Sequence, residues 1–368
     1  MTSDPGLASW LQLTLTPGLG ASAIRGMLRQ FGLPQSVLAR NQSELSAFAA
    51  PGTLEALRSE AVREAVARAL EWVSQPGHRL ITLAADAYPR TLLEIADPPP
   101  VLYARGRAEL LLQPALAIVG SRNATAQGES NAASFAKALS NAGLTIVSGL
   151  ALGVDTAAHR GGLAGTASTI AVLGTGIDVV YPRRNAELAE EIGVRGLLLS
   201  EFALGTGPVA HNFPRRNRLI SGLAQGCLVV EAAVESGSLI TARSAAEQGR
   251  EVFAIPGSIH SPISRGCHAL IKSGAKLVES AEDVLAELSG FRPSGYASTT
   301  ARATASGEVE QGLLAHMGHD PVDIDSLCGR AGMSAEQVSS ELLRLELEGR
   351  VTALPGGLYQ RLEKGNRR

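Results

Sequence analysis

The middle of this chain alternates between short apolar runs and segments of helical periodicity, and this alternation constrains the fold more than any other feature. Seven such runs fall at residues 116–119, 144–147, 169–173, 197–199, 228–230, 252–255 and 277–278. A strand followed by a helix, repeated many times, predicts a parallel sheet with helices on both faces. The runs also lack polar alternation, which is typical of strands buried on both sides. The sequence therefore predicts an α/β protein with a parallel, doubly wound sheet.

The residues before this sheet predict a small helical domain, residues 1–77. Apolar positions recur with helical spacing on both sides of Pro17-Gly18-Leu19-Gly20. This turn resembles that of a helix-hairpin-helix (SAM-like) module, whose glycines let backbone amides approach a phosphate. It could equally be a plain connection between helices, so both uses stay open. The sheet domain is expected at residues 78–288, with a short added strand at 101–103.

The C-terminal part predicts a flexible linker and a winged-helix domain. Residues 289–307 are poor in aliphatic side chains and rich in Ser, Thr, Ala and Gly, as flexible linkers are. Residues 308–368 then contain three short helical stretches, at 309–317, 324–331 and 334–348, and a hairpin formed by 351–354 and 358–360. The third helix carries Glu336, Glu341, Glu346 and Glu348 against the single Arg344, a poor complement to duplex phosphates. We therefore favour protein interaction over groove reading for this domain.

The charge balance restricts how this protein can bind a polyanion. The 368 residues carry a formal net charge of −2, so any nucleic-acid contact must come from a local basic patch. Cys227, Cys267 and Cys328 lie far apart, which fits buried thiols in a reducing cytoplasm and neither disulfides nor a cysteine metal site. The sequence has no signal-peptide pattern and no run of about eighteen apolar residues. We expect neither export nor membrane insertion.

Small and hydroxyl-bearing residues follow the predicted strands, where a ligand would bind. Ligands of open α/β sheets gather beyond the carboxyl ends of the strands, and small residues, hydroxyls and amides there can hold phosphate oxygens. The candidate residues at these ends are Gly120, Ser121, Arg122, Ser148, Gly149, Ser236, Gly237, Ser238 and Thr241. Arg122 would project over the crevice and bind a phosphate through its planar guanidinium, unless it pairs with Glu201 or Glu231.

A basic helix start adds a second phosphate-binding element. The stretch FPRRNRLIS, beginning at Phe213, puts three guanidiniums into the opening turn of a predicted helix. The candidate residues here are Phe213, Arg215, Arg216, Asn217 and Arg218. Phe213 could stack on a base or pack in the core. Together with the strand ends, this helix start predicts a groove for a single-stranded nucleic acid with little sequence selectivity.

Sequence motifs for catalysis and cofactor binding are missing. Neither the glycine spacing of dinucleotide-binding proteins nor a Walker A motif occurs. Asp155 and His159 stand four residues apart and could form an acid–base pair, but such a pair more often braces a helix. We therefore expect no cofactor, no metal and no catalytic residue.

The same segments resemble the DNA-processing protein A family, also called DprA or Smf. The resemblance rests on AIVGSR from Ala117, SGLALGVD from Ser148, TIAVLG from Thr169, Tyr181-Pro182, Ser200-Glu201, FPRRNRLISGL from Phe213 and ESGSLITA from Glu235. These segments follow one another in fixed order within residues 80–288. The resemblance implies an extended Rossmann-like domain, flanked by a helical N-terminal module and a winged-helix C-terminal domain.

The resemblance also implies a function. Members of the family bind the single-stranded DNA that enters during natural transformation (competence), protect it and load the RecA recombinase onto it, as homodimers joined through the Rossmann-like domain. Residues implicated in DNA binding fall on Gly120, Ser121 and Arg122 and on Arg216, Asn217 and Arg218. We expect a cytoplasmic, non-enzymatic mediator of DNA recombination.

Two other functions stay open. Related Rossmann-like enzymes bind nucleoside monophosphates and hydrolyse the glycosidic bond. Here the turn at 236–238 would take the phosphate, and Glu201, Glu231 or Glu235 would act on the ribose. The third possibility is a scaffold, with the acidic C-terminal helices as its docking face.

Overall fold

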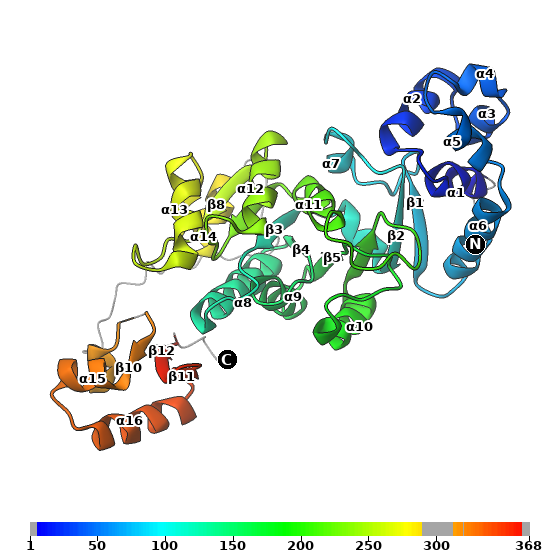
Figure 1. The fold of residues 1–368 in the computed structure, drawn as a ribbon. Helices are drawn as coiled ribbons and strands as arrows, with labels where there is room; N and C mark the ends of the chain where they lie inside the picture. The colour runs from blue at the N-terminus through cyan, green and yellow to red at the C-terminus, as the bar shows by residue number, and fades with distance from the viewer. Residues whose placement is uncertain (1–5, 289–311, 319, 363–368) are drawn as a thin grey trace.

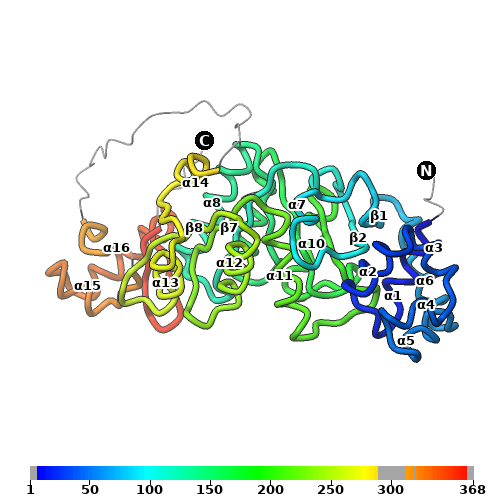
Figure 2. Tube along the Cα trace, turned by 90° about the horizontal axis from the view of Figure 1, so that it is seen from above, coloured from blue at the N-terminus to red at the C-terminus, as the bar shows by residue number. Residues whose placement is uncertain are grey.

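The computed structural model describes residues 6–288, 312–318 and 320–362. Figure 1 shows a central sheet domain, a helical module at one end of it and a smaller domain at the other. Seen from above, the two end domains again lie on opposite sides of the sheet (Figure 2), so the described part of the chain is elongated. The predicted linker at 289–307 lies outside the described residues.

The central sheet has nine strands in the order β1-β2-β6-β5-β4-β3-β7-β8-β9. The strands are β1 (His78–Thr82), β2 (Val101–Gly106), β3 (Ala115–Val119), β4 (Thr145–Ser148), β5 (Thr169–Val172), β6 (Leu197–Ser200), β7 (Gly226–Val229), β8 (Glu251–Ala254) and β9 (Lys276–Leu277). Strands β3 to β9 all pair in parallel, which confirms the predicted doubly wound sheet. The chain runs outward from β3 through β4 and β5 to β6 and then returns to β7 on the other side of β3. The topological switch point therefore lies between β3 and β7.

The first two strands depart from the predicted alternation of parallel strands and helices. β1 pairs antiparallel with β2, and β2 pairs antiparallel with β6. Parallel neighbours need a crossover connection, whereas β1 and β2 are joined by a segment containing only the one-turn helix α7 (Arg90–Leu93). The sheet is thus extended at one edge by an antiparallel pair.

Helices cover both faces of the sheet, as the continuous apolar strands predicted. The alternate side chains of β3 show this, because Leu116 and Ile118 belong to one core and Ala117 and Val119 to the other. The first core is covered by α8 (Ala126–Asn141), α9 (Val154–Leu163) and α14 (Ala281–Glu287), and the second by α11 (Asn212–Leu223), α12 (Gly237–Glu247) and α13 (Arg265–Lys272). A further helix, α10 (Ala186–Arg195), packs beside β5 and β6. Burying each strand on two sides holds its carboxyl end in a fixed place.

The N-terminal module is helical, as predicted. It consists of α1 (Leu7–Leu15), α2 (Ala21–Phe31), α3 (Pro34–Leu38), α4 (Gln42–Leu45), α5 (Pro51–Ala56) and α6 (Glu60–Val73). Leu13, Ile24 and Met27 lie in its own core, while Trp10 and Trp72 pack in a cluster shared with β2 and α10. The module is therefore seated on the antiparallel edge of the sheet through apolar contacts.

The C-terminal domain has the predicted winged-helix elements. It contains β10 (Val322–Asp323), α15 (Ile324–Ala331), α16 (Ala335–Leu347), β11 (Val351–Leu354) and β12 (Leu358–Arg361). In place of the predicted helix at 309–317, the described residues hold only a short 3-10 helix, Leu313–His316. Among the described helices, none is long and apolar enough to cross a membrane.

The cysteines fit the sequence expectation in two of three positions. Cys227 and Cys267 are buried, and burial raises the pKa of each thiol to about 12. Cys328 is only partly buried, so the expectation that all three thiols are buried was wrong for this residue.

Candidate nucleic-acid interface

A cleft of about 440 Å³ opens at the carboxyl ends of the parallel strands, next to the switch point between β3 and β7. Its walls come from the turns after β3, β4 and β5, from the start of α11 and from the start of α12. Each of these segments precedes or begins a helix, so small residues and helix N-termini converge there. Backbone N–H groups and the positive end of the helix dipole make such a site favourable for anions.

Eight of the predicted site residues line this cleft. They are Gly120, Arg122, Phe213, Arg216, Asn217, Gly237, Ser238 and Thr241. Ser121, Ser148, Gly149, Arg215, Arg218 and Ser236 are not among its lining residues. The turns after β3 and β7 and the start of α11 are thus brought together, whereas two of the three arginines on α11 lie elsewhere.

The rim of the cleft combines one arginine with two aromatic rings. Arg122 is exposed, and its guanidinium carbon lies 6.0 Å from the centroid of the Phe213 ring. Tyr181, which also lines the cleft, has its ring centroid 5.6 Å from that of Phe213 and is 45% exposed. Gly174 makes this packing possible, since a Cβ there would lie 2.7 Å from the Phe213 ring. A cation beside two partly open rings suits a phosphate and its neighbouring bases.

Sequence reasoning did not select Tyr181 as a site residue. Tyr181 lies in the connection after β5, and only the folded topology carries it to Phe213. The Tyr181-Pro182 dipeptide of the family resemblance could have pointed to it.

The start of α12 forms the opposite wall. The Ser236 hydroxyl caps the helix by accepting a hydrogen bond from the Ser238 N–H at 3.3 Å, and the two hydroxyls lie 2.7 Å apart. Ser238 and Thr241 are almost fully buried, so their side chains are packed within the wall and offer little surface to the open cleft. Across the cleft, the Asn217 amide donates to the Gly237 carbonyl at 3.4 Å and ties α11 to this wall.

Arg216 forms part of the cleft floor and does not project into solvent. The residue is only 5% exposed, and its Nη1 donates to the carbonyl oxygens of Gly149, at 2.7 Å, and of Val172. Gly149 must be glycine for this contact, because a Cβ would lie within 2.8 Å of the guanidinium. Burial lowers the pKa of Arg216 to about 10, which leaves it charged at neutral pH. The sequence expectation of three phosphate-facing arginines is thus corrected at this position.

Asp155 and His159 brace the turn after β4 from below. Asp155 Oδ2 accepts hydrogen bonds from the N–H groups of Gly149 at 3.1 Å and Ala151 at 3.3 Å. Burial raises the pKa of this carboxyl, while the Arg216 guanidinium and the two N–H donors oppose that shift. His159 Nε2 accepts from the Leu150 N–H at 3.3 Å, and Leu150 has a left-handed φ of 58°. The pair therefore holds a strained turn, in agreement with the bracing role favoured from the sequence.

His159 is held in its neutral form. Its Nδ1 lies 2.7 Å from the Thr169 hydroxyl, which itself donates to the Ile146 carbonyl, so Nδ1 carries the proton and Nε2 is the acceptor. Burial lowers the pKa of His159 to about 3, because a charged imidazole would lose its solvation there.

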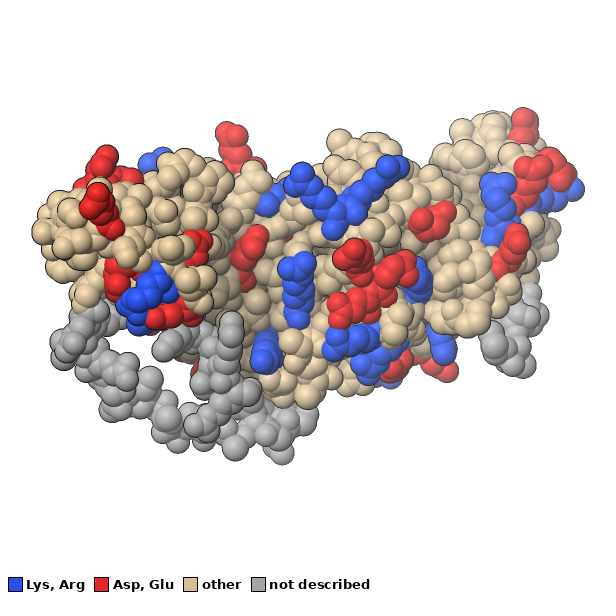
Figure 3. All heavy atoms as spheres, turned by 90° about the horizontal axis from the view of Figure 1, so that it is seen from below, with Lys and Arg blue, Asp and Glu red and all other residues tan. Residues whose placement is uncertain are grey.

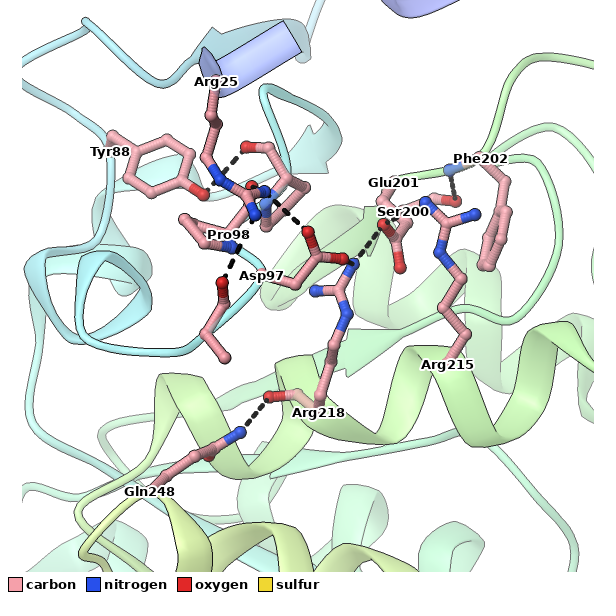
Figure 4. A network of polar contacts seen from close by, with 12 residues as sticks. Arg25, Tyr88, Asp97, Pro98, Ser200, Glu201, Phe202, Arg215, Arg218 and Gln248 are labelled. Carbon is pink, nitrogen blue, oxygen red and sulfur yellow. Dashed lines mark hydrogen bonds and ion pairs between the residues drawn. The ribbon is translucent and has the colours of Figure 1, made fainter. Parts of the chain in front are cut away.

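Arg215 and Arg218 point to the other side of α11, toward Glu201 at the end of β6 (Figure 4). Glu201 Oε2 accepts from Arg215 Nη2 at 3.1 Å and from Arg218 Nη2 at 2.6 Å. Burial raises the pKa of the Glu201 carboxyl, and the two guanidiniums act in the opposite direction. The pairing that the sequence left open for Arg122 with Glu201 is therefore made by these two arginines instead.

The glutamates of the alternative enzyme lie away from the cleft. Within the described residues, Glu201, Glu231 and Glu235 do not line it, and Glu231 accepts from the N–H and hydroxyl of Thr125 at 2.9 and 2.6 Å. Over the same residues, no group of three His, Cys, Asp or Glu side chains could hold a metal ion. Asp155 does line the cleft, but its Oδ2 accepts hydrogen bonds from the N–H groups of Gly149 and Ala151, so this carboxylate holds the turn after β4.

Charged side chains of both signs are mixed on the face of the molecule that Figure 3 shows. Seen from below, Lys and Arg side chains lie among Asp and Glu side chains on the central body and at both ends (Figure 3). This agrees with the formal net charge of −2 and leaves local groups such as Arg122 to attract an anion.

Two family models match the sheet domain and the C-terminal part of the chain. Residues 79–289 match the family model described as DNA recombination-mediator protein A, and residues 297–357 match the DprA winged helix domain. Protein Smf of Escherichia coli K12 is 44% identical over 310 residues, covering 82% of each chain. DNA processing protein DprA of Streptococcus pneumoniae R6 is 52% identical over 202 residues, covering 55% of this chain and 71% of that protein.

Two solved structures resemble this fold. The X-ray structure of DNA processing protein A from Streptococcus pneumoniae has a TM-score of 0.65 and 39% identity, covering 77% of this chain and 97% of that one. A structure of DNA processing protein A from Helicobacter pylori, concerned with its single-stranded DNA binding mode, has a TM-score of 0.51 and 30% identity, covering 56% of this chain and 94% of that one.

Proposed function

The chain belongs to the DNA recombination-mediator protein A family, and from this premise we propose that its strand-end cleft binds single-stranded DNA for delivery to the RecA recombinase. In this proposal the protein works in the cytoplasm as a homodimer joined through its Rossmann-like domain. It protects DNA taken up in natural transformation and does so by binding, without catalysis. The single-stranded DNA binding mode of the Helicobacter pylori relative supports the choice of ligand.

The observation that carries the proposal is the grouping of Arg122, Tyr181 and Phe213 on one rim. A guanidinium binds a phosphate without regard to the base attached to it. An aromatic face stacks on any base, and each stacked base contributes about 1–3 kcal/mol. A flexible strand can adapt to both groups, whereas the bases of a duplex are already stacked on one another. The cleft therefore suits a single strand and predicts little sequence selectivity.

The experiment is a titration of a fluorescently labelled oligothymidine with the wild-type protein and with Arg122→Ala. We expect the variant to bind about tenfold more weakly, and the slope of log Kd against log salt to fall by about 0.7, the value for one phosphate contact on a single strand. Arg107→Ala is the matched control, because Arg107 is an exposed arginine that contacts the carbonyl of Arg195, away from the cleft. An Arg122→Ala protein with unchanged affinity and salt slope would refute the assigned cleft.

Delivery to the recombinase needs its own test. RecA filament formation on oligothymidine coated with single-strand-binding protein should be accelerated by the wild-type protein and not by Arg122→Ala. If both proteins bind DNA as expected and neither changes the rate of filament formation, the delivery step of the proposal is wrong while the binding step stands.

A further inference from the structure

Helix α11 presents two different faces to the rest of the molecule. Phe213, Arg216, Asn217 and Ile220 have the i, i+3, i+4, i+7 spacing of one helical stripe, and all four line the cleft. Arg215 and Arg218, three residues apart, form a second stripe that contacts Glu201. Because both stripes belong to one helix, a shift or rotation of α11 that moves Arg215 and Arg218 also moves the residues that line the cleft.

The second stripe is connected to the N-terminal module through one aspartate. Figure 4 shows the Arg218 guanidinium lying between the carboxylates of Glu201 and Asp97. Its Nη2 is 2.6 Å from Glu201 Oε2 and 3.5 Å from Asp97 Oδ2. The other oxygen of Asp97, Oδ1, accepts from Nη1 of Arg25 on α2 at 2.6 Å. A continuous row of charges thus runs from α2 to the end of β6.

Arg25 also fixes the backbone around Asp97. Its Nη1 donates to the Pro98 carbonyl at 3.0 Å, and its Nη2 donates to the Ala96 carbonyl at 3.3 Å. One guanidinium therefore holds the Asp97 side chain and the carbonyls on both sides of it. The Asp97 carboxylate can meet Arg218 in the observed place only while this segment is held.

Burial makes the row sensitive to the loss of a member. The side chains of Arg25, Arg218 and Glu201 are only 13%, 16% and 2% exposed. Glu201 Oε1 and Arg218 Nη1 are buried, and no described residue hydrogen-bonds to either atom. Glu201 thus depends on the contacts to its Oε2, and buried charges that lose a partner are costly. The Asp97 side chain is 40% exposed, so without Arg25 its carboxylate can turn toward water, and Arg218 then loses the 3.5 Å contact that helps to hold its guanidinium in place.

We propose that Arg25 and Asp97 are positioning residues for the DNA-binding face of α11. In this proposal the helical module fixes the orientation of that face without itself contacting DNA. This inference rests on the proposed function for its ligand, although the contacts themselves do not depend on it. The coupling runs from α2 through Asp97 to Arg218 and from there, within one helix, to Phe213 and Asn217.

The test compares Arg25→Ala with Arg29→Ala, which removes an exposed arginine one turn further along the same helix. We expect Arg25→Ala to weaken oligothymidine binding about three- to tenfold, within the range of coupling between distant sites, and Arg29→Ala to leave it unchanged. The salt slope should remain that of the wild type in both variants, because no phosphate contact is lost. Arg25→Lys should restore only part of the affinity, because a single ammonium cannot make the contacts that Nη1 and Nη2 make together. Asp97→Asn should add little when combined with Arg25→Ala.

Amide hydrogen exchange of α11 in the absence of DNA gives a second readout. In Arg25→Ala, the amides of α11 should exchange faster than in the wild type, whereas those of α8 should not change. Unchanged exchange in α11, or a salt slope that falls as it does for Arg122→Ala, would overturn the positioning role. Failure of the wild type to bind DNA would refute the proposed function, and the exchange experiment would still decide the coupling.

Discussion

The floor and the rim of the cleft each contain an arginine, and the two arginines are used in opposite ways. On the floor, Arg216, Asp155 and His159 are buried, and each hydrogen-bonds to the backbone of the turn after β4. On the rim, Arg122 is exposed and Tyr181 is nearly half exposed. Burial ties a polar side chain to the polypeptide, because leaving it unpaired is costly, while exposure leaves it free to bind a ligand.

An arginine in a predicted DNA-binding segment therefore need not face the ligand. Arg216 and Arg122 line the same cleft, yet only Arg122 is exposed to solvent. Changes on the floor should therefore lower stability, and changes on the rim should lower affinity. Stability and affinity can be measured separately, so experiments can contradict this division between floor and rim.

The largest expected effect is that of Arg216→Ala on stability. The substitution leaves the carbonyls of Gly149 and Val172 without this donor and removes the cation that favours ionised Asp155. We expect a loss of about 3–5 kcal/mol in the free energy of unfolding, as for breaking a buried ionic interaction. Urea denaturation followed by circular dichroism measures it. Arg107→Ala, the exposed control, should change stability by no more than about 0.5 kcal/mol. A similarly small loss for Arg216→Ala would mean that the guanidinium does not support the floor.

The next effect is a pH dependence due to His159. Its pKa is about 3 in the folded protein and about 6.5 in an unfolded chain, so the unfolded state binds more protons between these values. The stability that His159 contributes is thus complete above the higher value and is lost as the pH falls from about 6.5 toward about 3. Between pH values of about 7 and about 5, this loss amounts to about 2 kcal/mol.

The measurement compares urea unfolding of the wild type and His159→Gln at both pH values. The difference between the two proteins isolates His159 from buried carboxyls such as Asp155 and Glu201, whose raised pKa values act in the opposite direction. If the stability of the wild type and that of His159→Gln fall equally over this range, the imidazole is not held neutral in the floor.

The smallest effect belongs to the rim. Tyr181→Ala should weaken oligothymidine binding by about 1 kcal/mol, the lower end of the range for a stacked base, because the ring is partly exposed. Tyr181→Phe keeps the aromatic face and should bind as the wild type does. Stability should be unchanged in both variants, and fluorescence anisotropy together with a urea titration tests the two statements. Weaker binding by Tyr181→Phe would point to the hydroxyl and against stacking.

Most of the sheet could be predicted from the sequence, and its antiparallel edge could not. The parallel strands are continuous apolar runs because helices cover both faces, and each predicted run overlaps an observed strand. β1 has the sequence HRLIT, of which only Ile81 and Thr82 are buried, so it lacks such a run. β2 was predicted as a short added strand. Its antiparallel pairing with β6 could not be predicted, because β6 comes much later in the chain and meets β2 only in the folded sheet.

The site was predictable in position but not in orientation. The strand-end turns and the start of α11 do meet at one cleft, as the rule for open α/β sheets implies. The sequence could not show that Arg216 turns inward, because this depends on Gly149 leaving room for its guanidinium. Helical spacing alone could have separated Arg215 and Arg218 from Phe213 and Asn217, since the two pairs lie on different sides of one helix.

The most direct test of the account is photocrosslinking of the protein to an oligothymidine that carries 5-iodouracil, followed by mapping of the crosslinked peptides. We predict crosslinks at Phe213 and Tyr181, and a crosslinking yield about fivefold lower in the Arg122→Ala protein at a DNA concentration near the wild-type Kd, as binding about tenfold weaker requires. Crosslinks confined to the helical module or to the winged-helix domain, with none at the cleft rim, would contradict the account.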